Sequence, residues 1–470
     1  MARRRTARCE QRVAPPTRVT VIGAGAVGVM TAYSLARRGI KVRLLDSQSE
    51  AAVACSNVNA GSLGRLGTRT IAHPAQILRL GKAVVLGDPV FRLDFVGMFT
   101  SVKFWRFAFP YAFAVLWFPW RHRNEAFSLN NMKWMADVMV EAIEREQVGP
   151  VQRGMLLVHM DGMAPPTGPP KEAGHSGTLL TAEEAVQKEP MLADVRERIV
   201  AAMELPGHPY AECGETVRKL LKVCQEKYGV DVMYNAPVAG LRDSFGAITS
   251  IHLVDDRIIK IPLDEAVVIC AGEKAPQLLE PLQVRAPVIG MRGYSVTTKN
   301  PPGGPKQMLV LEPEHLYASP YSGGNVRFAS IAEFGGGYAP NVATELGRGR
   351  EAGIQVIRNK VKDNLPQLLS AVENPKDEMC GARPQLPDDQ PMVGRAPRFT
   401  NLYVNVGHGQ FGWQMSGGCA ELVAAAMTGE TTPCVDPACL SPARFDKFQA
   451  PWKWVGGVET PGPRLAKLDS

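Results

Sequence analysis

A glycine-rich turn near the N-terminus constrains the fold of this chain more than any other feature. Residues 19–22 form a β-branched run that predicts a strand, residues 27–38 carry apolar residues at helical spacing, and residues 40–45 predict a second strand. Between the first strand and the helix stands a GxGxxG pattern, made by Gly23, Gly25 and Gly28. In such a unit the first glycine permits a tight turn, the second leaves room for a pyrophosphate, and the third lets helix and strand pack closely.

An acidic residue at the end of the second strand supports this interpretation. Asp46 lies 18 residues after Gly28, where a carboxylate can accept hydrogen bonds from a ribose hydroxyl. The N-terminus of the helix would offer free N–H groups and a partial positive charge to the phosphates. A coincidental glycine turn would leave Asp46 unexplained, so the unit predicts dinucleotide binding. It does not by itself separate NAD from FAD.

Two further loops favour FAD. The first follows Asp46 closely, where a flavoprotein loop would run along the pyrophosphate, and contains Ser56, Asn59 and Gly61. The second leads from a predicted strand into a helix and contains Gly407, Gly409 and Gly412. A second glycine-rich helix start supplies N–H groups that could face the N1–C2=O edge of a flavin ring. NAD enzymes have no need of this element.

More helices and strands of the same kind are scattered along the chain. Helices are predicted at 214–228 and 416–427, and strands at 230–234, 247–254, 266–270 and 402–406. Although far apart in sequence, these pieces resemble one parallel-sheet domain of α/β class. The predicted domains are a basic extension, 1–17; the parallel-sheet domain, 18–61, 206–285 and 380–432; a second domain, 62–205 and 286–379; and a tail, 433–470.

Charge and cysteine content exclude several classes of protein. The net charge is +7, but the first 18 residues hold six arginines against one acid, Glu10, and the remainder is nearly balanced. A nucleic-acid-binding function therefore loses its main support. The nine cysteines form no CxxC pair, and their odd number argues against a secreted disulfide framework.

The N-terminal extension bears on localisation. Residues 1–17 lack the apolar core of a secretory signal, and their Arg-rich, acid-poor composition fits a mitochondrial transit peptide. A disordered tail that ends in the stiff Pro15-Pro16 pair is the alternative. No run reaches the roughly 18 apolar residues that cross a bilayer. We expect a protein that is not secreted and resides in mitochondria or, in a bacterium, in the cytoplasm at the inner face of the membrane.

A series of motifs gives the chain a family resemblance. In order they read VIGAGAVGV with LLD, CSNVNAGS, APVAGL, VVICAG, MRGYSVT, CGARPQLPDDQPMVG and NLYVNVGHGQFGWQMSGG. Over residues 18–432 they resemble the D-amino-acid-oxidase-like flavoproteins, on the D-amino-acid dehydrogenase branch. The resemblance implies a glutathione-reductase-like FAD-binding Rossmann domain with an interleaved substrate domain built on a mostly antiparallel sheet. It also implies non-covalent FAD and oxidative deamination of a small D-amino acid by hydride transfer to flavin N5, with a quinone-type electron acceptor.

The resemblance also implies roles for individual residues. Those expected to contact FAD are Gly23, Gly25, Gly28, Asp46, Ser56, Asn59, Gly61, Val238 and Gly272, with Gly407, Gly409 and Gly412 around the flavin ring. Arg383 matches the arginine that binds the substrate carboxylate, a task suited to a planar guanidinium; a surface arginine is the alternative. Tyr294 would face the substrate, or else be a buried structural tyrosine. No metal constellation is expected, and His408 is expected to matter through its backbone.

The chain departs from the family pattern near the expected substrate side. A threonine and a glycine are replaced by Leu386 and Asp389, a tyrosine near Leu316 is absent although Tyr317 and Tyr321 are close by, and a glycine pair is missing near Ala329-Ser330. These departures keep two rivals open. One is an oxygen-using oxidase of glycine, sarcosine or another secondary amine, and the other is a catalytically silent, membrane-associated flavoprotein. Cys380 lies one residue out of register with a cysteine that carries covalent flavin in some relatives, which favours non-covalent FAD.

Residues 104–120 are not explained by the resemblance. They hold nine aromatic residues in 17 positions and are followed by Arg121-His122-Arg123. Pro110 and Pro119 are expected to break any long helix. Aromatic residues beside a basic cluster suit a membrane interface, whereas a buried wall of the second domain is the alternative. We expect a peripheral membrane contact through 104–123, which would bring the flavin near a lipid-soluble quinone.

Overall fold

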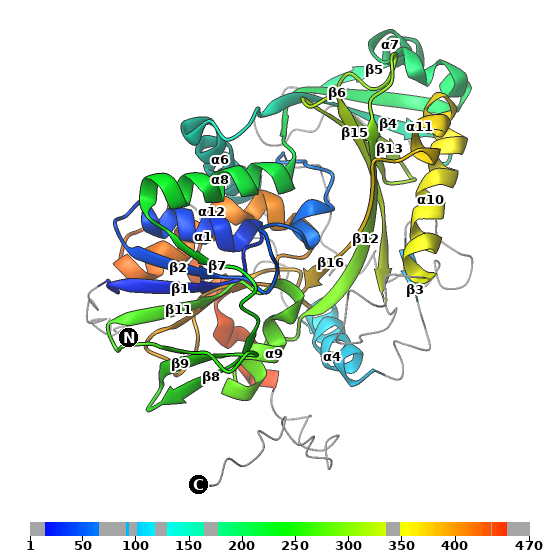
Figure 1. The fold of residues 1–470 in the computed structure, drawn as a ribbon. Helices are drawn as coiled ribbons and strands as arrows, with labels where there is room; N and C mark the ends of the chain where they lie inside the picture. Colours follow the sequence, from blue (N-terminus) through cyan, green and yellow to red (C-terminus); the bar gives the residue numbers. More distant parts are fainter. Residues whose placement is uncertain are drawn as a thin grey trace, which may run out of the picture.

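Three β-sheets organise the described part of the chain (Figure 1). The computed structural model describes residues 15–64, 91–93, 101–117, 129–163, 177–334, 348–433 and 435–448. Most of the basic extension, the basic cluster after residue 120 and most of the tail lie outside these ranges, so the predictions made for them stay predictions.

Sheet A is the predicted parallel sheet. Its order is β17 (Met392–Arg395), β18 (Leu402–Val406), β11 (Glu265–Ile269), β1 (Arg18–Ile22), β2 (Lys41–Leu45) and β7 (Asp231–Met233). All neighbours pair in parallel except β17 and β18. One face is covered by α1 (Ala26–Ala36), α6 (Leu129–Glu146), α8 (Cys213–Tyr228) and α12 (Gly412–Thr428) (Figure 1). The central strands β18, β11 and β1 are almost wholly buried, because both of their faces are covered.

The other face of sheet A is covered by a small sheet C and by α9 (Ala275–Leu279). Sheet C is antiparallel and consists of β8 (Val238–Ser244), β9 (Ala247–Leu253) and β10 (Ile258–Lys260). The strand predicted at 247–254 is therefore present but does not belong to the parallel sheet. The reason lies in its entry: Phe245 and Gly246 both have positive φ and form a two-residue hairpin turn, which makes β9 pair directly with β8.

Sheet B is larger and mostly antiparallel. Its order is β16 (Asp377–Gln385), β12 (Ile289–Lys299), β15 (Asn325–Phe334), β14 (Leu316–Tyr321), β13 (Met308–Glu312), β4 (Gln152–Met160), β6 (Ile199–Tyr210) and β5 (Thr178–Leu180), with β3 (Phe91–Leu93) beside β15. Only the β13–β4 and β15–β3 pairs are parallel. The predicted fold class, a Rossmann-type parallel domain joined to a mostly antiparallel sheet, is confirmed.

The two faces of sheet B have different neighbours. The outer face packs its apolar residues against α10 (Arg348–Asn364), α11 (Leu369–Glu373) and α7 (Ala182–Lys188). The inner face carries Met155, Val310 and Tyr321 and is turned toward the glycine-rich edge of sheet A (Figure 1). Because side chains alternate along each strand, the parity of a residue decides which face it joins.

Short 3₁₀ helices link these elements. They are η1 (Cys55–Asn57), η2 (Pro190–Arg198), η3 (Gly272–Lys274), η4 (Glu280–Leu282), η5 (Pro366–Leu368), η6 (Gly409–Phe411), η7 (Pro437–Leu440) and η8 (Pro442–Phe448).

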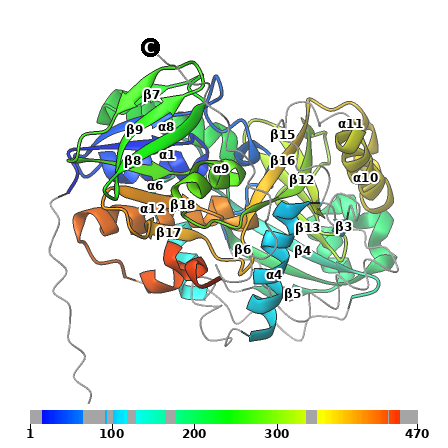
Figure 2. The same cartoon turned by 90° about the horizontal axis from the view of Figure 1, so that it is seen from below.

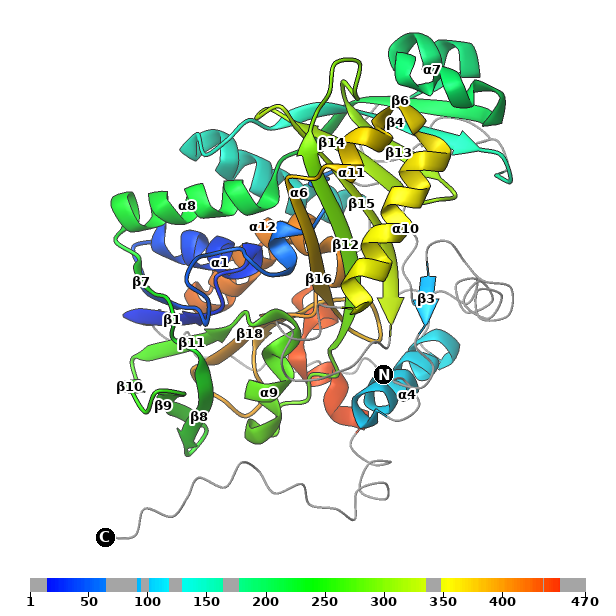
Figure 3. The same ribbon diagram turned by 45° about the vertical axis from the view of Figure 1, so that its right-hand side comes forward.

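The aromatic segment forms a helix, α4 (Val102–Trp117), beside the first part of β12 (Figures 2 and 3). The expectation that Pro110 breaks any long helix here was wrong, because it lies inside these 16 residues. Pro119 lies outside the described residues. Pro110 removes one backbone hydrogen bond, but it is buried, and Phe107 packs with Ile289 and Met291 on the same side. The outward side exposes Trp105, Phe109 and Phe113, spaced four residues apart. Among the described residues, no helix is long and apolar enough to cross a membrane.

Candidate functional site

The carboxyl ends of four neighbouring strands of sheet A bring together the predicted cofactor residues. Gly407 follows β18, Gly272 follows β11, Gly23 follows β1 and Asp46 follows β2. In open parallel sheets, ligands bind outside these ends of the strands. Residues from both halves of the chain thus lie along one edge.

Each of the three glycines in the first turn is required for a different structural reason. A Cβ at Gly23, whose φ is +109°, would lie 2.6 Å from the carbonyl oxygen of Cys270, and a Cβ at Gly28 would collide with the carbonyl of Gly23. Both positions are closed by the protein itself. Among the described residues, a Cβ at Gly25 would meet only the Ser56 hydroxyl, at 3.2 Å. The space beside Gly25 is therefore left to a ligand, as expected for a pyrophosphate.

Asp46 is fixed beside this turn. Its carboxylate accepts hydrogen bonds from the backbone N–H of Ala24 at 2.5 Å and of Gln48 at 2.8 Å. About two of its roughly four acceptor positions are used in this way, and the others can accept from ribose hydroxyls. The backbone carbonyl of Asp46 accepts from Ala236 at 2.8 Å, and Val238 begins β8 two residues later. Val238 thus also lies near the sheet edge.

The loop at residues 56–61 is shaped by its own side chains. The Ser56 hydroxyl accepts from the N–H of Ala26 at the start of α1, at 3.0 Å. The Asn59 side chain donates to the Ser56 carbonyl at 3.0 Å and accepts from the N–H of Gly61 at 2.8 Å. The Ser319 hydroxyl on the inner face of sheet B donates to the carbonyl of Ala60 at 2.7 Å. Ser56 and Asn59 therefore hold the loop in position, and its backbone remains to meet a cofactor.

Arg327 clamps the same loop and was missed by sequence reasoning. It is only 2% exposed, and its guanidinium donates to Thr297 at 3.0 Å, to the carbonyl of Asn59 at 3.3 Å and to the carboxylate of Glu212 at 2.9 Å. It therefore joins two strands of sheet B, the 56–61 loop and the start of α8. No local motif marks it, because its partners come from distant parts of the sequence.

The second glycine loop is packed against the end of β16. A Cβ at Gly407, where φ is +81°, would collide with Leu386, and one at Gly409 would lie 2.5 Å from the Gln385 side-chain oxygen. The family departure at Leu386 thus fills space directly beneath this loop. Burial lowers the pKa of His408 to about 3, so its imidazole is uncharged and a poor base near neutral pH.

Buried polar atoms at this loop fit a flavin. The side-chain oxygen of Gln385 and Nε2 of His408 are buried and have no hydrogen-bond partner among the described residues. Leaving such an atom unpaired costs about 1–3 kcal/mol. A flavin ring carries both donors and acceptors along its edge, and the open space at Gly25 accommodates a pyrophosphate. The polar atoms and the open space at this edge of sheet A therefore fit FAD.

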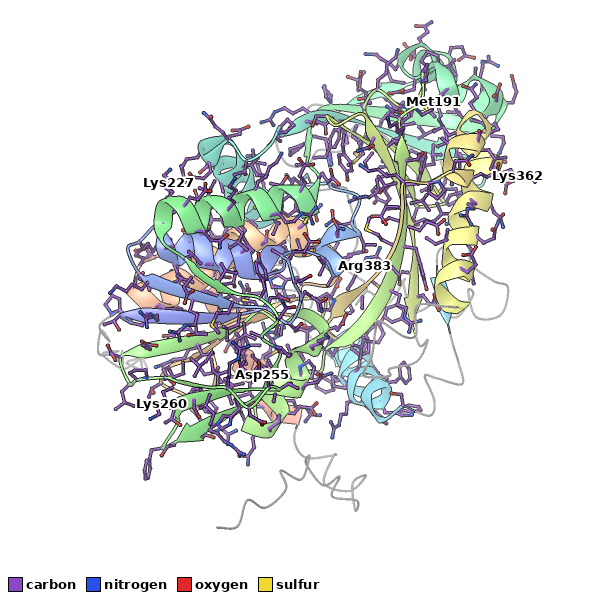
Figure 4. All side chains as sticks on the ribbon, viewed as in Figure 1. Met191, Lys227, Asp255, Lys260, Lys362 and Arg383 are labelled. Atoms are coloured by element: carbon purple, nitrogen blue, oxygen red, sulfur yellow. The ribbon has the colours of Figure 1, made fainter. Side chains whose placement is uncertain are left out.

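Arg383 lies on β16 where sheet B faces sheet A (Figure 4). Its guanidinium lies across Gly293 of the neighbouring strand, where any side chain would collide with it. It donates to the carbonyl of Arg292 at 3.3 Å. Gly381, which shares this face, packs against Cys55 and Val58 of the cofactor loop. Burial lowers the pKa of Arg383, and the groups at Cys55, Tyr317 and Cys380 act in the opposite direction.

Tyr317 shares the inner face with Arg383, and Tyr294 does not. Burial and the Glu312 carboxylate raise the pKa of Tyr317, and the nearby Arg383 guanidinium lowers it. Tyr294 pairs with Cys380, whereas Arg383 pairs with Met291 three positions away, so the two side chains lie on opposite faces.

The surroundings of Tyr294 are those of a core residue. It is 1% exposed and donates to Glu333 at 2.6 Å, and a Cβ at Gly353 of α10 would lie 2.5 Å from its ring. The structure therefore does not bring Tyr294 together with Arg383. The sequence signal that could have found Tyr317 is its alternation with Ser319 and Tyr321 along β14.

Known proteins resemble this chain over nearly its whole length. It is 26% identical over 446 residues to a D-amino acid dehydrogenase of Chromohalobacter salexigens, covering 91% of this chain and 99% of that protein. It is 28% identical over 447 residues to a D-amino acid dehydrogenase of Xanthobacter autotrophicus, with the same two coverages of 91% and 99%.

Solved structures share the fold. Glycine oxidase from Geobacillus kaustophilus superposes with a TM-score of 0.63 at 20% identity, over 91% of this chain and 99% of that one. L-Proline dehydrogenase from P. horikoshii gives 0.62 at 18% identity, over 93% and 99%. Residues 18–426 match the family described as FAD dependent oxidoreductase, DAO. With most of its length matched and the FAD-compatible sheet edge in place, the chain belongs to the DAO family of FAD-dependent oxidoreductases.

Proposed function

We propose that this protein is an FAD-dependent dehydrogenase that oxidises an amino acid, specifically a D-amino acid, to an imino acid that water converts to a 2-oxo acid and ammonia. The observation that carries the proposal is the Arg383 guanidinium, held across Gly293 on the face of sheet B that is turned toward the glycine loops. The relatives described as D-amino acid dehydrogenases support the choice of substrate class.

The protein's own residues position the substrate in this proposal. Arg383 binds the carboxylate through two parallel hydrogen bonds, and the Tyr317 hydroxyl donates a third. These contacts fix the α-carbon toward the glycine-rich edge of sheet A, which converts an encounter into an aligned reaction. Bound FAD would supply the acceptor for the α-hydrogen as a hydride. His408 takes no proton here, because its pKa of about 3 keeps it neutral.

Non-covalent attachment of FAD is part of the proposal. Cys380 pairs with Tyr294 and packs with the apolar residues of the outer face, under α10. Its thiol thus lies on the opposite face of β16 from Arg383. Mild denaturation should release free FAD from the purified yellow protein. Flavin that stays with the chain after denaturation would contradict this attachment.

Anaerobic mixing with candidate substrates tests which amino acid the protein oxidises. The FAD-loaded protein is mixed with D-amino acids, glycine, sarcosine and proline, and the loss of the yellow absorbance is followed in time. We expect D-amino acids to reduce the flavin fastest. Faster reduction by glycine or sarcosine would move the protein to the second candidate, an amine oxidase, which the shared fold with glycine oxidases favours. No reduction by any of these compounds would overturn the proposed function.

The proposed electron acceptor is a quinone reached by peripheral contact with a membrane. Trp105, Phe109 and Phe113 form an exposed aromatic stripe on α4. This helix packs against the first part of β12. Aromatic side chains of this kind settle at the headgroup level of a bilayer. The proposed location is the mitochondrion or the inner face of a bacterial membrane. In air the reduced protein should form little hydrogen peroxide and should be reoxidised rapidly by a soluble quinone analogue; rapid peroxide formation would contradict a dehydrogenase.

A further inference from the structure

The inner face of sheet B continues past Tyr317 to an acidic residue. Glu312 ends β13 and pairs with His159 of the parallel strand β4. Alternation with Val310 and Leu157, which belong to the inner-face cluster, puts both side chains on the same face as Tyr317. A carboxylate and an imidazole therefore lie side by side on the surface that would face a substrate.

Glu312 and His159 lie largely enclosed within the protein. The Glu312 side chain is 18% exposed, and its carboxylate meets Nδ1 of His315 at 2.9 Å. Both ring nitrogens of His159 are buried and have no hydrogen-bond partner among the described residues. Burial lowers the pKa of His159, and Glu312 opposes that shift. An uncharged imidazole with unpaired nitrogens can bind a further donor.

Tyr317 links this pair to Arg383. Both Glu312 and Arg383 act electrostatically on the Tyr317 hydroxyl. From Gly293, beneath the Arg383 guanidinium, the strand order β12, β15, β14, β13 leads to Glu312. Three strand-to-strand spacings of about 4.8 Å place Glu312 on the order of 14 Å from Gly293. With a contact of about 3 Å at each end, that span suits an amino acid whose side chain is several methylenes long.

We propose that Glu312, with His159 beside it, is the subsite for the end of the substrate side chain and selects amino acids with a basic side chain. The inference rests on the proposed function and names its substrate class. A partly buried carboxylate attracts a guanidinium or ammonium group and repels an acidic one. With Arg383 on the carboxylate, the substrate is held at both ends by opposite charges.

Flavin reduction by D-arginine and D-citrulline tests the subsite. The two compounds have nearly the same shape and differ in the charge at the end of the side chain. For the FAD-loaded protein we expect D-arginine to be preferred about 10- to 100-fold, the size of one charge-assisted contact. Glu312→Gln should remove most of that preference, through the apparent dissociation constant and not the limiting rate of reduction.

Glu314→Gln is the matched control. Glu314 lies in the same turn and its substitution changes the net charge equally, but its carboxylate lies 3.8 Å from Lys360 of the outer-face helix α10. This variant should keep the preference for D-arginine. If D-alanine reduces the flavin but the wild type treats D-arginine and D-citrulline alike, the subsite is overturned and the proposed function stands. If no D-amino acid reduces the flavin, both are overturned.

Discussion

The glycine-rich edge of sheet A and the inner face of sheet B face each other, and the proposed function assigns them opposite means of recognition. At the edge of sheet A the proposed recognition depends on the absence of side chains: among the described residues, only Ser56 borders the space beside Gly25. On the inner face the proposed recognition depends on long side chains, with Arg383 and Tyr317 reaching from separate strands. Added atoms should therefore damage cofactor binding, whereas removed atoms should damage substrate binding.

The largest expected effect comes from filling the space at Gly25. Gly25 has an ordinary φ of −72°, so Gly25→Leu should fold normally, while its side chain occupies the room of a pyrophosphate. We expect the flavin-to-protein ratio to fall nearly to zero with unchanged circular dichroism. Gly240→Leu, where a Cβ would have no neighbour within 4 Å, should keep its flavin. A yellow Gly25→Leu protein would contradict a pyrophosphate site beside Gly25.

Removal of the Arg383 guanidinium should leave the cofactor bound and weaken the substrate reaction. Loss of a charge-assisted contact costs about 1.5–3 kcal/mol, which is roughly 10- to 150-fold in kcat/KM for flavin reduction by Arg383→Met. Arg358→Met is the control, because Arg358 lies on α10 and binds Glu351 of the same helix and Glu378 of β16. Equal rates in Arg383→Met and the wild type would mean that the carboxylate is held elsewhere.

Two tyrosines on opposite faces of sheet B test which face binds the substrate. Tyr317→Phe should lower kcat/KM roughly 5- to 10-fold, about 1–1.4 kcal/mol, because one hydrogen bond to the substrate is lost. Tyr294→Phe removes the buried bond to Glu333 and should lower the melting temperature with little change in kcat/KM. Steady-state kinetics and thermal unfolding of both variants decide this, and the reverse pattern would place the substrate on the other face.

The smallest expected effect concerns α4, outside both ligand surfaces. Trp105→Ser with Phe109→Ser should weaken sedimentation with anionic liposomes about 5-fold, on the order of 1 kcal/mol for the lost apolar contact. Flavin content should stay the same. High salt should weaken binding of the wild type, because basic residues near an anionic surface are screened. Liposome binding that is unaffected by both changes would refute a contact through α4.

The sequence allowed the parallel sheet and the place of its glycine turn to be predicted because their signals are local. The strand, the glycine turn and Asp46 lie within one short unit, and each residue type has a physical reason at its place. The inner face of sheet B depends on pairing between distant strands. A shift of one position reverses the face of a residue. The resemblance left Tyr294 either facing the substrate or buried as a structural residue, and only the pairing of β12 with β16 puts its side chain on the outer face. Pro110 misled for a similar reason, since tertiary packing outweighed its local preference.

The Arg327 clamp has a consequence for how the protein matures. Arg327 and Asn59 are 268 residues apart, and sheet A itself is complete only when β18 pairs with β11. Although the N-terminal βαβ unit leaves the ribosome first, its loop cannot be held until β15 has been synthesised, and the second glycine loop follows later still. We infer that flavin is captured by the finished chain and not during translation. A chain cut short before β18 would therefore be released without its cofactor, with the edge of sheet A unpaired and prone to aggregation.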